Sequence, residues 1–219
     1  MMAAEGGVPP LVTQPVSPRG EIPPEPPDLA ARSLTVASRL LAGGTTFFFL
    51  AFVFAYFYLR SINQEHLWRH GHLKPNNALG AAMIACIVVS AALTIFSGRQ
   101  MKSGSRGWVG PAVGGVVLGL AAVALQCIEF TVQHFGPTDG SYASVFCAWT
   151  GLYLIAALAT LYWLETQLAS ELRARRTPAA RGEIEAADLL ILPGLDATVF
   201  YWAYLAAIGV VMYVVLYLL

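Results

Sequence analysis

Hydrophobic residues fall into five long stretches that contain no charged side chain. They span residues 40–59, 78–98, 107–128, 141–164 and 197–219. A helix needs about 20 apolar residues to cross the hydrocarbon core of a bilayer. Its backbone groups must also be satisfied within the segment, because no water is available there. The pattern therefore predicts an all-α membrane protein with five transmembrane helices.

Proline sets the N-terminal segment apart from these stretches. Residues 1–30 contain eight of the 13 prolines and few apolar residues. Such a composition cannot bury enough apolar surface to offset the loss of chain entropy on folding. We therefore expect residues 1–30 to be a disordered tail and residues 31–219 to form one transmembrane domain.

Composition agrees with a chain that folds in a bilayer. Hydrophobic residues make up 57% of the chain and charged residues 12%, whereas soluble domains are about one quarter charged. The formal net charge is zero, so the total charge gives no sign of a nucleic-acid partner. We expect membrane lipids around the chain and no nucleic acid.

The distribution of positive charge predicts the orientation of the chain. Lys and Arg are in excess in the cytoplasmic loops of membrane proteins. With five crossings, the N-terminal tail shares one side with the second-to-third and fourth-to-fifth loops. That side carries ten basic residues and the other side three. We therefore expect the N-terminus in the cytoplasm and the C-terminus outside.

Tyr and Trp residues gather near the ends of several stretches, where such side chains anchor helices at membrane interfaces. They are Trp108, Tyr142, Tyr162, Trp163, Tyr201, Trp202 and Tyr217.

Glycine is concentrated in the third stretch. Gly110 and Gly114 are four residues apart, as are Gly115 and Gly119. Small residues at this spacing let two helix backbones approach closely. We expect the third helix to pack centrally among its neighbours through these four glycines.

The loop between the fourth and fifth stretches is the longest. Glu171 precedes Arg175 by four residues, which favours a helical extension of the fourth stretch. The pair Thr177-Pro178 is expected to end that extension, and residues 183–192 are expected to form a short surface helix.

The sequence offers little catalytic or metal-binding chemistry. It contains no nucleotide-binding loop, catalytic triad, paired-carboxylate arrangement or CxxCH motif. The histidines lie outside the five stretches and lack the cysteines that commonly complete structural zinc sites. We expect no metal, no cofactor and no catalytic residue, and no intramembrane heme held by a histidine of this chain. The four histidines are His66, His70, His72 and His134.

Glu129 is the charge of most interest, because it ends the third stretch one turn after Gln126. An ionisable residue at a membrane edge is a candidate functional group. The favoured interpretation is that Glu129 reaches the outer interface and ends the span, since charges are tolerated better there than at the centre. The alternative is that it pairs with a neighbouring helix or subunit. Beyond it, Asp139 and Ser141 are placed to cap the fourth helix.

Three passages resemble subunit III of the heme-copper oxidases. Residues 45–60, TTFFFLAFVFAYFYLR, are similar to the aromatic first helix of the short family form, which ends in a Tyr–Phe pair and an arginine, here Arg60. Residues 197–219 are similar to the final helix, with its Tyr-Trp start and closing tyrosine. Residues 125–151 carry the most specific motif. It matches at Gln126, Glu129, Phe130, Asp139, Tyr142, Ser144, Phe146, Thr150 and Gly151.

The resemblance covers about residues 35–219 and implies a five-helix, non-catalytic subunit of a respiratory terminal oxidase. Family members pack against subunit I, which holds the hemes and copper, and contact other oxidase subunits. They bind phospholipid in a V-shaped cleft between two groups of helices, and they support proton uptake. The resemblance also implies a multi-pass protein of a bacterial-type plasma membrane.

This sequence departs from the family at two positions that carry family roles. Thr45 stands where members usually have a glutamate in the first helix. Tyr153 and Ala156 stand where many members have histidines. Those carboxylate and histidine roles therefore do not transfer.

Two alternative functions remain open from the sequence. One is a subunit III-like protein of a quinol oxidase or a nitric oxide reductase. The other is a small transporter, although transporters tend to place ionisable groups at mid-membrane and these stretches hold none.

Overall fold

The computed structural model describes residues 26–63, 68–69, 73–103, 106–176 and 181–219. Most of the predicted tail lies outside these residues, as do His66, His70 and His72.

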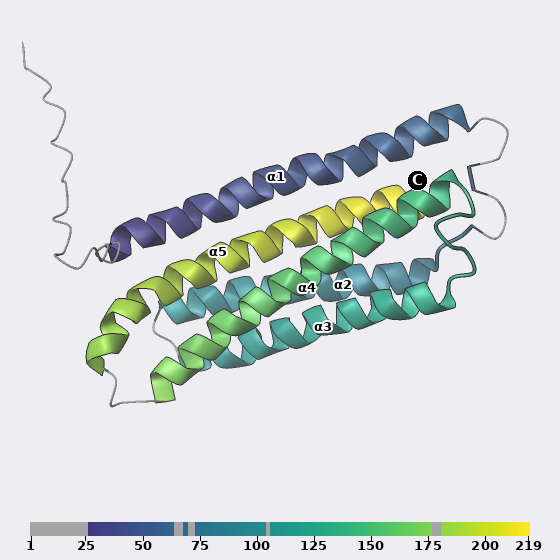
Figure 1. The fold of residues 1–219 in the computed structure, drawn as a ribbon. Helices are drawn as coiled ribbons and strands as arrows, with labels where there is room; N and C mark the ends of the chain where they lie inside the picture. The colour runs from purple at the N-terminus through teal and green to yellow at the C-terminus, as the bar shows by residue number, and fades with distance from the viewer. Residues whose placement is uncertain (1–25, 64–67, 70–72, 104–105, 177–180) are drawn as a thin grey trace, which may run out of the picture.

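Five long helices make up this part of the chain (Figure 1). They are α1 (Pro27–Ile62), α2 (Asn77–Lys102), α3 (Val109–Val132), α4 (Ser141–Arg176) and α5 (Arg181–Tyr213). A short 3-10 helix, η1 (Arg106–Trp108), leads into α3, and a π-helix, η3 (Val214–Leu218), continues α5. All five long helices are long and apolar enough to cross a membrane. The prediction of an all-helical chain with five such helices is confirmed for the described residues.

Several helices extend beyond the predicted spans. Helix α1 begins at Pro27, so residues 27–30 belong to a helix and not to the tail. Helix α4 runs on to Arg176, as the predicted extension requires. The break expected at Thr177-Pro178 falls on residues that the structure does not describe. Residues 183–192 are part of α5 and not a separate surface helix, and Pro193 lies inside that helix.

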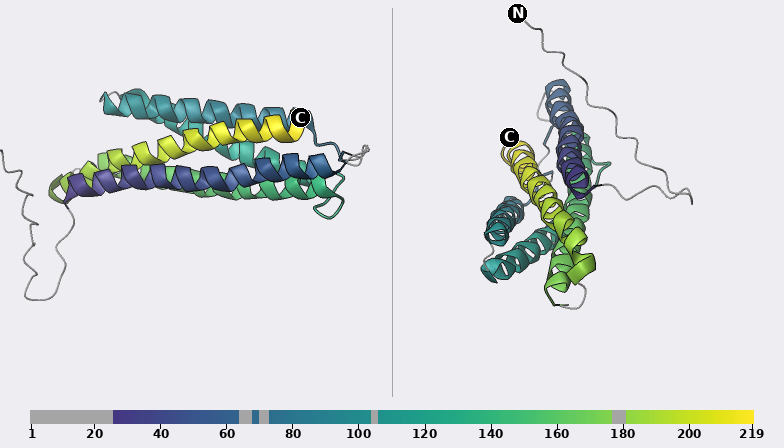
Figure 2. Two further views of the ribbon diagram at one scale, coloured as in Figure 1. Left: turned by 90° about the horizontal axis from the view of Figure 1, so that it is seen from above. Right: turned by 90° about the vertical axis from the view of Figure 1, so that its left-hand side faces the viewer.

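Helix α5, and not α3, occupies the centre of the bundle. It packs against α1, α2 and α4, whereas α3 packs against α2 and α4. The end-on view places α3 at the edge of the bundle (Figure 2). In the apolar part of α3, 28% of the residues are buried, compared with 44% in α5. The predicted central position of the third helix is wrong, because its main neighbours are α2 and α4, whereas α5 packs against three long helices.

Two of the four glycines predicted to serve packing are at close helix contacts. A Cβ atom on Gly115 would lie 2.6 Å from Thr94 Cγ2 and 3.2 Å from the backbone oxygen of Ser90 on α2. A Cβ atom on Gly119 would lie 2.5 Å from Leu161 Cδ2 on α4. Gly115 is the stricter of the two contacts, because backbone atoms of α2 lie beside it, whereas the end of the Leu161 side chain lies beside Gly119.

The other two glycines do not bring helices together. No atom lies within 4 Å of the Cβ position at Gly110. At Gly114 the nearest atom is Leu93 Cδ1 at 3.4 Å, an ordinary contact. The predicted packing role is thus wrong for Gly110. At Gly114 the neighbouring helix is not close enough to require a glycine.

Most of the aromatic residues expected at the membrane interface are instead buried in the bundle. Tyr162 is exposed, but five others are at most 6% exposed. These five are Trp108, Tyr142, Tyr201, Trp202 and Tyr217.

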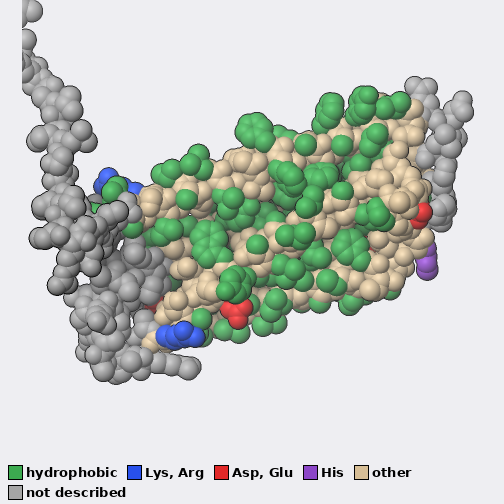
Figure 3. Space-filling model, in the orientation of Figure 1, with side chains coloured by type: hydrophobic (Ala, Val, Ile, Leu, Met, Phe, Trp, Pro, Cys, Tyr) green, Lys and Arg blue, Asp and Glu red, His purple; other side chains and the backbone are tan. Residues whose placement is uncertain are grey.

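The outer surface of the bundle is largely apolar (Figure 3). Helix α1 contributes most clearly, with Phe47 78% exposed and Leu40 and Phe54 both 70% exposed. In the view of Figure 3, Lys and Arg side chains lie toward the end where α1 begins. Large exposed apolar faces are what a chain surrounded by lipid hydrocarbon requires.

The glycine contacts predict different effects of alanine at two positions of α3. Gly115→Ala places a methyl group against Thr94 and the Ser90 backbone, and such overpacking costs about 1–3 kcal/mol. We expect a lower apparent melting temperature in mild detergent. Gly110→Ala is the matched control, because its methyl group meets open space and alanine favours helix by up to ~1 kcal/mol. Equal melting temperatures for the two variants would contradict the close contact at Gly115.

Candidate functional site

Polar residues of loops and helix ends meet at one end of the bundle. The end of α3, the start of α4 and the C-terminus lie at this end, opposite the start of α1 (Figure 1). The chain termini of the helical bundle are thus at opposite ends, as five crossings demand.

Glu129, in the last turn of α3, is 1% exposed. The Tyr217 hydroxyl donates a hydrogen bond of 2.6 Å to Glu129 Oε2. Gln126 Nε2, one turn earlier on α3, donates to the same oxygen at 3.2 Å. The favoured expectation, that Glu129 reaches outward to the interface, is therefore wrong. The alternative interpretation, pairing with a neighbouring helix, describes the observed geometry.

The Tyr217 ring reaches Glu129 because α2 leaves room for it. A Cβ atom on Gly80 would lie 2.5 Å from Tyr217 Cε1. The ring also contacts Phe146 edge-on at 5.5 Å between centroids and stacks on Tyr213 at 5.1 Å. A hydroxyl group is thus held rigidly against a buried carboxyl group by residues from α2, α4 and α5.

A second set of hydrogen bonds joins Arg69, in the loop between α1 and α2, to the π-helix. The backbone oxygen of Leu216 accepts a hydrogen bond of 2.7 Å from the Tyr142 hydroxyl, and it also accepts one from Arg69. The Arg69 guanidinium donates to the Tyr142 hydroxyl at 3.1 Å and lies over the Tyr142 ring. Carbonyl groups near a helix end lack partners within the helix. Tyr142 and Arg69 supply them here, and a cation is favoured at this end of a helix.

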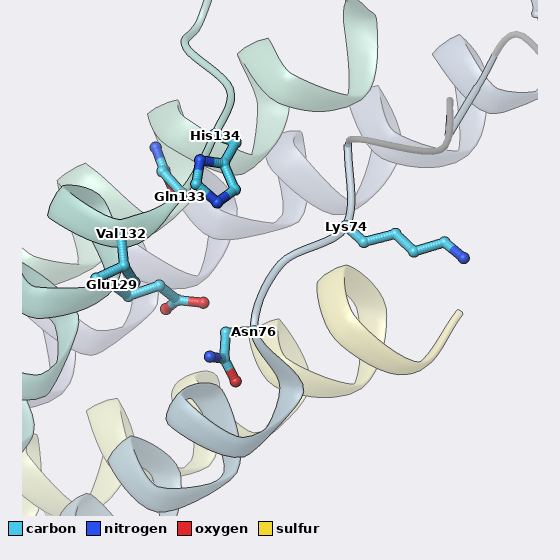
Figure 4. Close-up of a pocket in the computed structure, with 6 residues that line it drawn as sticks. All are labelled: Lys74, Asn76, Glu129, Val132, Gln133 and His134. Atoms are coloured by element: carbon cyan, nitrogen blue, oxygen red, sulfur yellow. The ribbon is translucent and has the colours of Figure 1, made fainter.

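A pocket of about 430 Å³ opens beside Glu129 (Figure 4). It is lined by Lys74, Asn76, Glu129, Val132, Gln133 and His134. The Asn76 side chain accepts hydrogen bonds from the backbone N–H groups of Ala78 and Leu79, which caps the start of α2. The pocket therefore lies between the end of α3 and the start of α2.

The remaining predicted site residues lie outside the Glu129 network. Asp139 Oδ2 accepts from the Gly136 backbone N–H at 2.7 Å, so it closes the turn before α4 and does not cap the helix. Ser144 donates to the backbone oxygen of Pro137 at 2.5 Å. Arg60 is exposed in the last turn of α1. No atom lies within 4 Å of the Cβ position at Gly151, so no helix approaches closely there.

The chain matches no protein-family model, and no curated protein matches it.

The geometry supports hydrogen bonding and packing more than covalent chemistry. Within the described residues, no three His, Cys, Asp or Glu side chains gather in a way that could hold a metal ion. His134 is exposed after the end of α3. The expectation that this chain supplies no ligand to a metal or heme stays a prediction.

The sequence predictions missed three residues that build this end. They are Arg69, Gly80 and Asn76. A signal existed for Asn76, because an asparagine just before an apolar stretch is a common helix cap. No local pattern connects Arg69 with a backbone oxygen 147 positions away.

The Tyr217–Glu129 bond predicts a specific loss on removal of one oxygen. Tyr217→Phe keeps the ring but leaves a buried carboxyl oxygen with one fewer donor, which costs about 1–3 kcal/mol. We expect a lower apparent melting temperature in mild detergent. Tyr213→Phe is the control, because that ring stacks on Tyr217 and is not part of the bond to Glu129. If Tyr213→Phe lowers the melting temperature as much, the hydroxyl is not the stabilising group.

Proposed function

We propose that the chain is a non-catalytic, subunit III-like component of a respiratory heme-copper oxidase. In this role it packs against a catalytic subunit that carries heme and copper. It supports that subunit through helix packing, phospholipid binding and proton uptake, in a reaction that couples oxygen reduction to proton pumping.

The observation that carries the proposal is the contact between the three passages on which the resemblance rests. Glu129 and Tyr217 join the second and third passages through a hydrogen bond. Thr45 and Tyr201 join the first and third at 2.9 Å, and Thr46 and Tyr204 do so at the same distance.

The first and second passages are also in contact. The Phe52 ring stacks on the Trp149 ring at 5.9 Å between centroids. The Phe49 ring lies 6.1 Å from the ring of Tyr153, which is two residues beyond the second passage. Residues that carry the resemblance thus pack together, which is expected if these passages preserve one structural unit.

The placement of charge supports an accessory role over solute transport. Transporters tend to hold ionisable groups at broken helices near the middle of the membrane. Among the described residues, Glu129 is a buried carboxyl group, and it lies near the end of α3 beside the outer pocket.

The orientation follows from the basic residues. We place the N-terminus in the cytoplasm and the C-terminus outside a bacterial-type plasma membrane, since the loops on the N-terminal side carry most of the Lys and Arg.

Purification from native membranes tests the proposed assembly. We expect the tagged chain, solubilised in mild detergent, to retain partners with heme and copper absorption, and the chain produced without partners to be colourless. Activity assays on the complex then identify its electron donor and whether it reduces oxygen or nitric oxide. A colourless preparation from native membranes that moves a solute in vesicles would reject the oxidase role.

Reporter fusions test the orientation. We expect alkaline phosphatase fused after Leu219 to be active, because this enzyme needs the oxidising exterior, and green fluorescent protein at the same position to be dark. Fusions after Arg176 are the control, since that end of α4 is expected in the cytoplasm and should give the reverse pattern. Fluorescence without phosphatase activity at Leu219 would overturn the assigned orientation.

A further inference from the structure

Tyr217 differs from other tyrosines of the bundle in the group that its hydroxyl binds. It donates to a carboxyl oxygen, Glu129 Oε2, over 2.6 Å. Four other tyrosine hydroxyl groups bond to neutral oxygen atoms, which belong to the backbone or to threonine side chains. They are those of Tyr142, Tyr153, Tyr201 and Tyr204. An ionised carboxyl group is a base that can take the proton of a phenol, whereas backbone and hydroxyl oxygens are far weaker bases.

The surroundings of Glu129 allow its carboxyl group to gain and lose a proton. Gln126 Nε2 donates to Oε2 at 3.2 Å, and the backbone N–H of Asn76 also donates to the carboxyl group. These donors and the Tyr217 hydroxyl favour the ionised form, whereas burial favours the neutral form. Because the two effects oppose each other, both forms of the carboxyl group are accessible.

A second oxidisable ring connects Tyr217 with the surface of the bundle. The Tyr213 ring stacks on the Tyr217 ring, with 5.1 Å between the centroids and 27° between the planes. Tyr217 is 3% exposed, whereas Tyr213 is partly exposed. Aromatic rings in contact exchange electrons readily, because their π orbitals overlap. Tyr213 therefore offers a path by which an electron can leave the buried ring.

We propose that Tyr217 is a proton-coupled redox site, which a one-electron oxidant outside the bundle oxidises through Tyr213. One electron leaves the Tyr217 ring and passes through Tyr213 to the oxidant. The phenolic O–H bond breaks, and the proton moves to Glu129 Oε2 along the hydrogen bond. The products are a neutral tyrosyl radical and a neutral carboxyl group. A peroxyl radical is an oxidant of this class, since it gains one electron and, with a proton from water, becomes a hydroperoxide.

The proton acceptor makes Tyr217 the favoured place for the missing electron. An oxidised phenol that keeps its proton is positively charged, and an isolated charge in an apolar interior is costly. At Tyr217 the proton moves to a negatively charged group, so neither product carries a charge. Tyr153 is also buried, but it donates to the backbone oxygen of Leu205, which is no base. A one-electron reductant such as a hydroquinone restores the site when the proton returns from Glu129.

The proposal goes beyond the proposed oxidase role, because no step of this cycle needs heme, copper or another subunit. The full chain produced without partners is therefore sufficient for the test. A negative result would leave the oxidase assembly untouched, since that assembly is tested by bound heme and copper.

Flash oxidation of the purified full chain in mild detergent tests the proposal. The parent chain carries Tyr58→Phe and Tyr162→Phe, because these two tyrosines are more than half exposed and would be oxidised directly. A photo-excited ruthenium tris(bipyridine) complex with an electron acceptor supplies the oxidant, and EPR spectroscopy after rapid freezing measures the tyrosyl radical. We expect Tyr217→Phe to lower the radical yield several-fold. An equal yield with and without the Tyr217 hydroxyl would overturn the proposal.

Glu129→Gln tests the proton acceptor, because glutamine keeps an oxygen for the Tyr217 hydroxyl but is not a base. We expect a several-fold lower radical yield than in the parent chain. If this variant does not fold, the rate of radical formation in the parent chain is compared in H₂O and D₂O. Breaking the O–H bond predicts a slower rate in D₂O. An unchanged yield in folded Glu129→Gln protein, or equal rates in the two solvents, would overturn the proposal.

Two further variants test the path of the electron. Tyr213→Phe removes the oxidisable ring that stacks on Tyr217, and we expect the radical to form several-fold more slowly. Tyr204→Phe is the matched control, because Tyr204 is also a partly exposed tyrosine of α5 and its hydroxyl pairs with that of Thr46. Its yield and rate should equal those of the parent chain. An unchanged rate in Tyr213→Phe would overturn the assigned path, and a loss in Tyr204→Phe as large as in Tyr217→Phe would overturn the assignment of the radical.

Discussion

The end of the bundle that contains the C-terminus depends on the hydrogen bond between Tyr217 and Glu129. A carboxyl group placed at the end of an apolar helix must find partners or remain in water. Glu129 finds them inside the bundle, because Tyr217 reaches it through the space above Gly80. This contact joins α3 to the π-helix that continues α5.

Hydrogen bonds between side chains and backbone groups also join α2, α3 and α5 farther from this end of the bundle. Trp202 on α5 donates to Ser90 on α2, and Ser90 donates to the backbone oxygen of Gly115 on α3. Lipid hydrocarbon is as apolar as a leucine side chain, so burial of apolar surface gives little preference for one helix over another. Close packing at small residues and hydrogen bonds between helices supply that preference, and α2, α3 and α5 use both.

The arrangement separates two kinds of surface. The polar network and its pocket lie at one end of the bundle, where α3 ends and α2 begins. The long apolar face of α1, with residues such as Phe47 and Phe54, lies along the membrane. Many polar groups of the described residues thus hold the chain's own helices together.

The sequence by itself determined the number of membrane-crossing helices and their approximate positions, because span length and freedom from charge are local properties that the bilayer imposes. It also marked Gln126 and Glu129 as the unusual pair. Only the tertiary structure decided that Glu129 turns inward, that α5 is the central helix and that Gly115 but not Gly110 is a close contact. These outcomes depend on which residues of distant helices face one another, such as Gly80 and Tyr217, and a hydrophobicity pattern carries no information about that pairing.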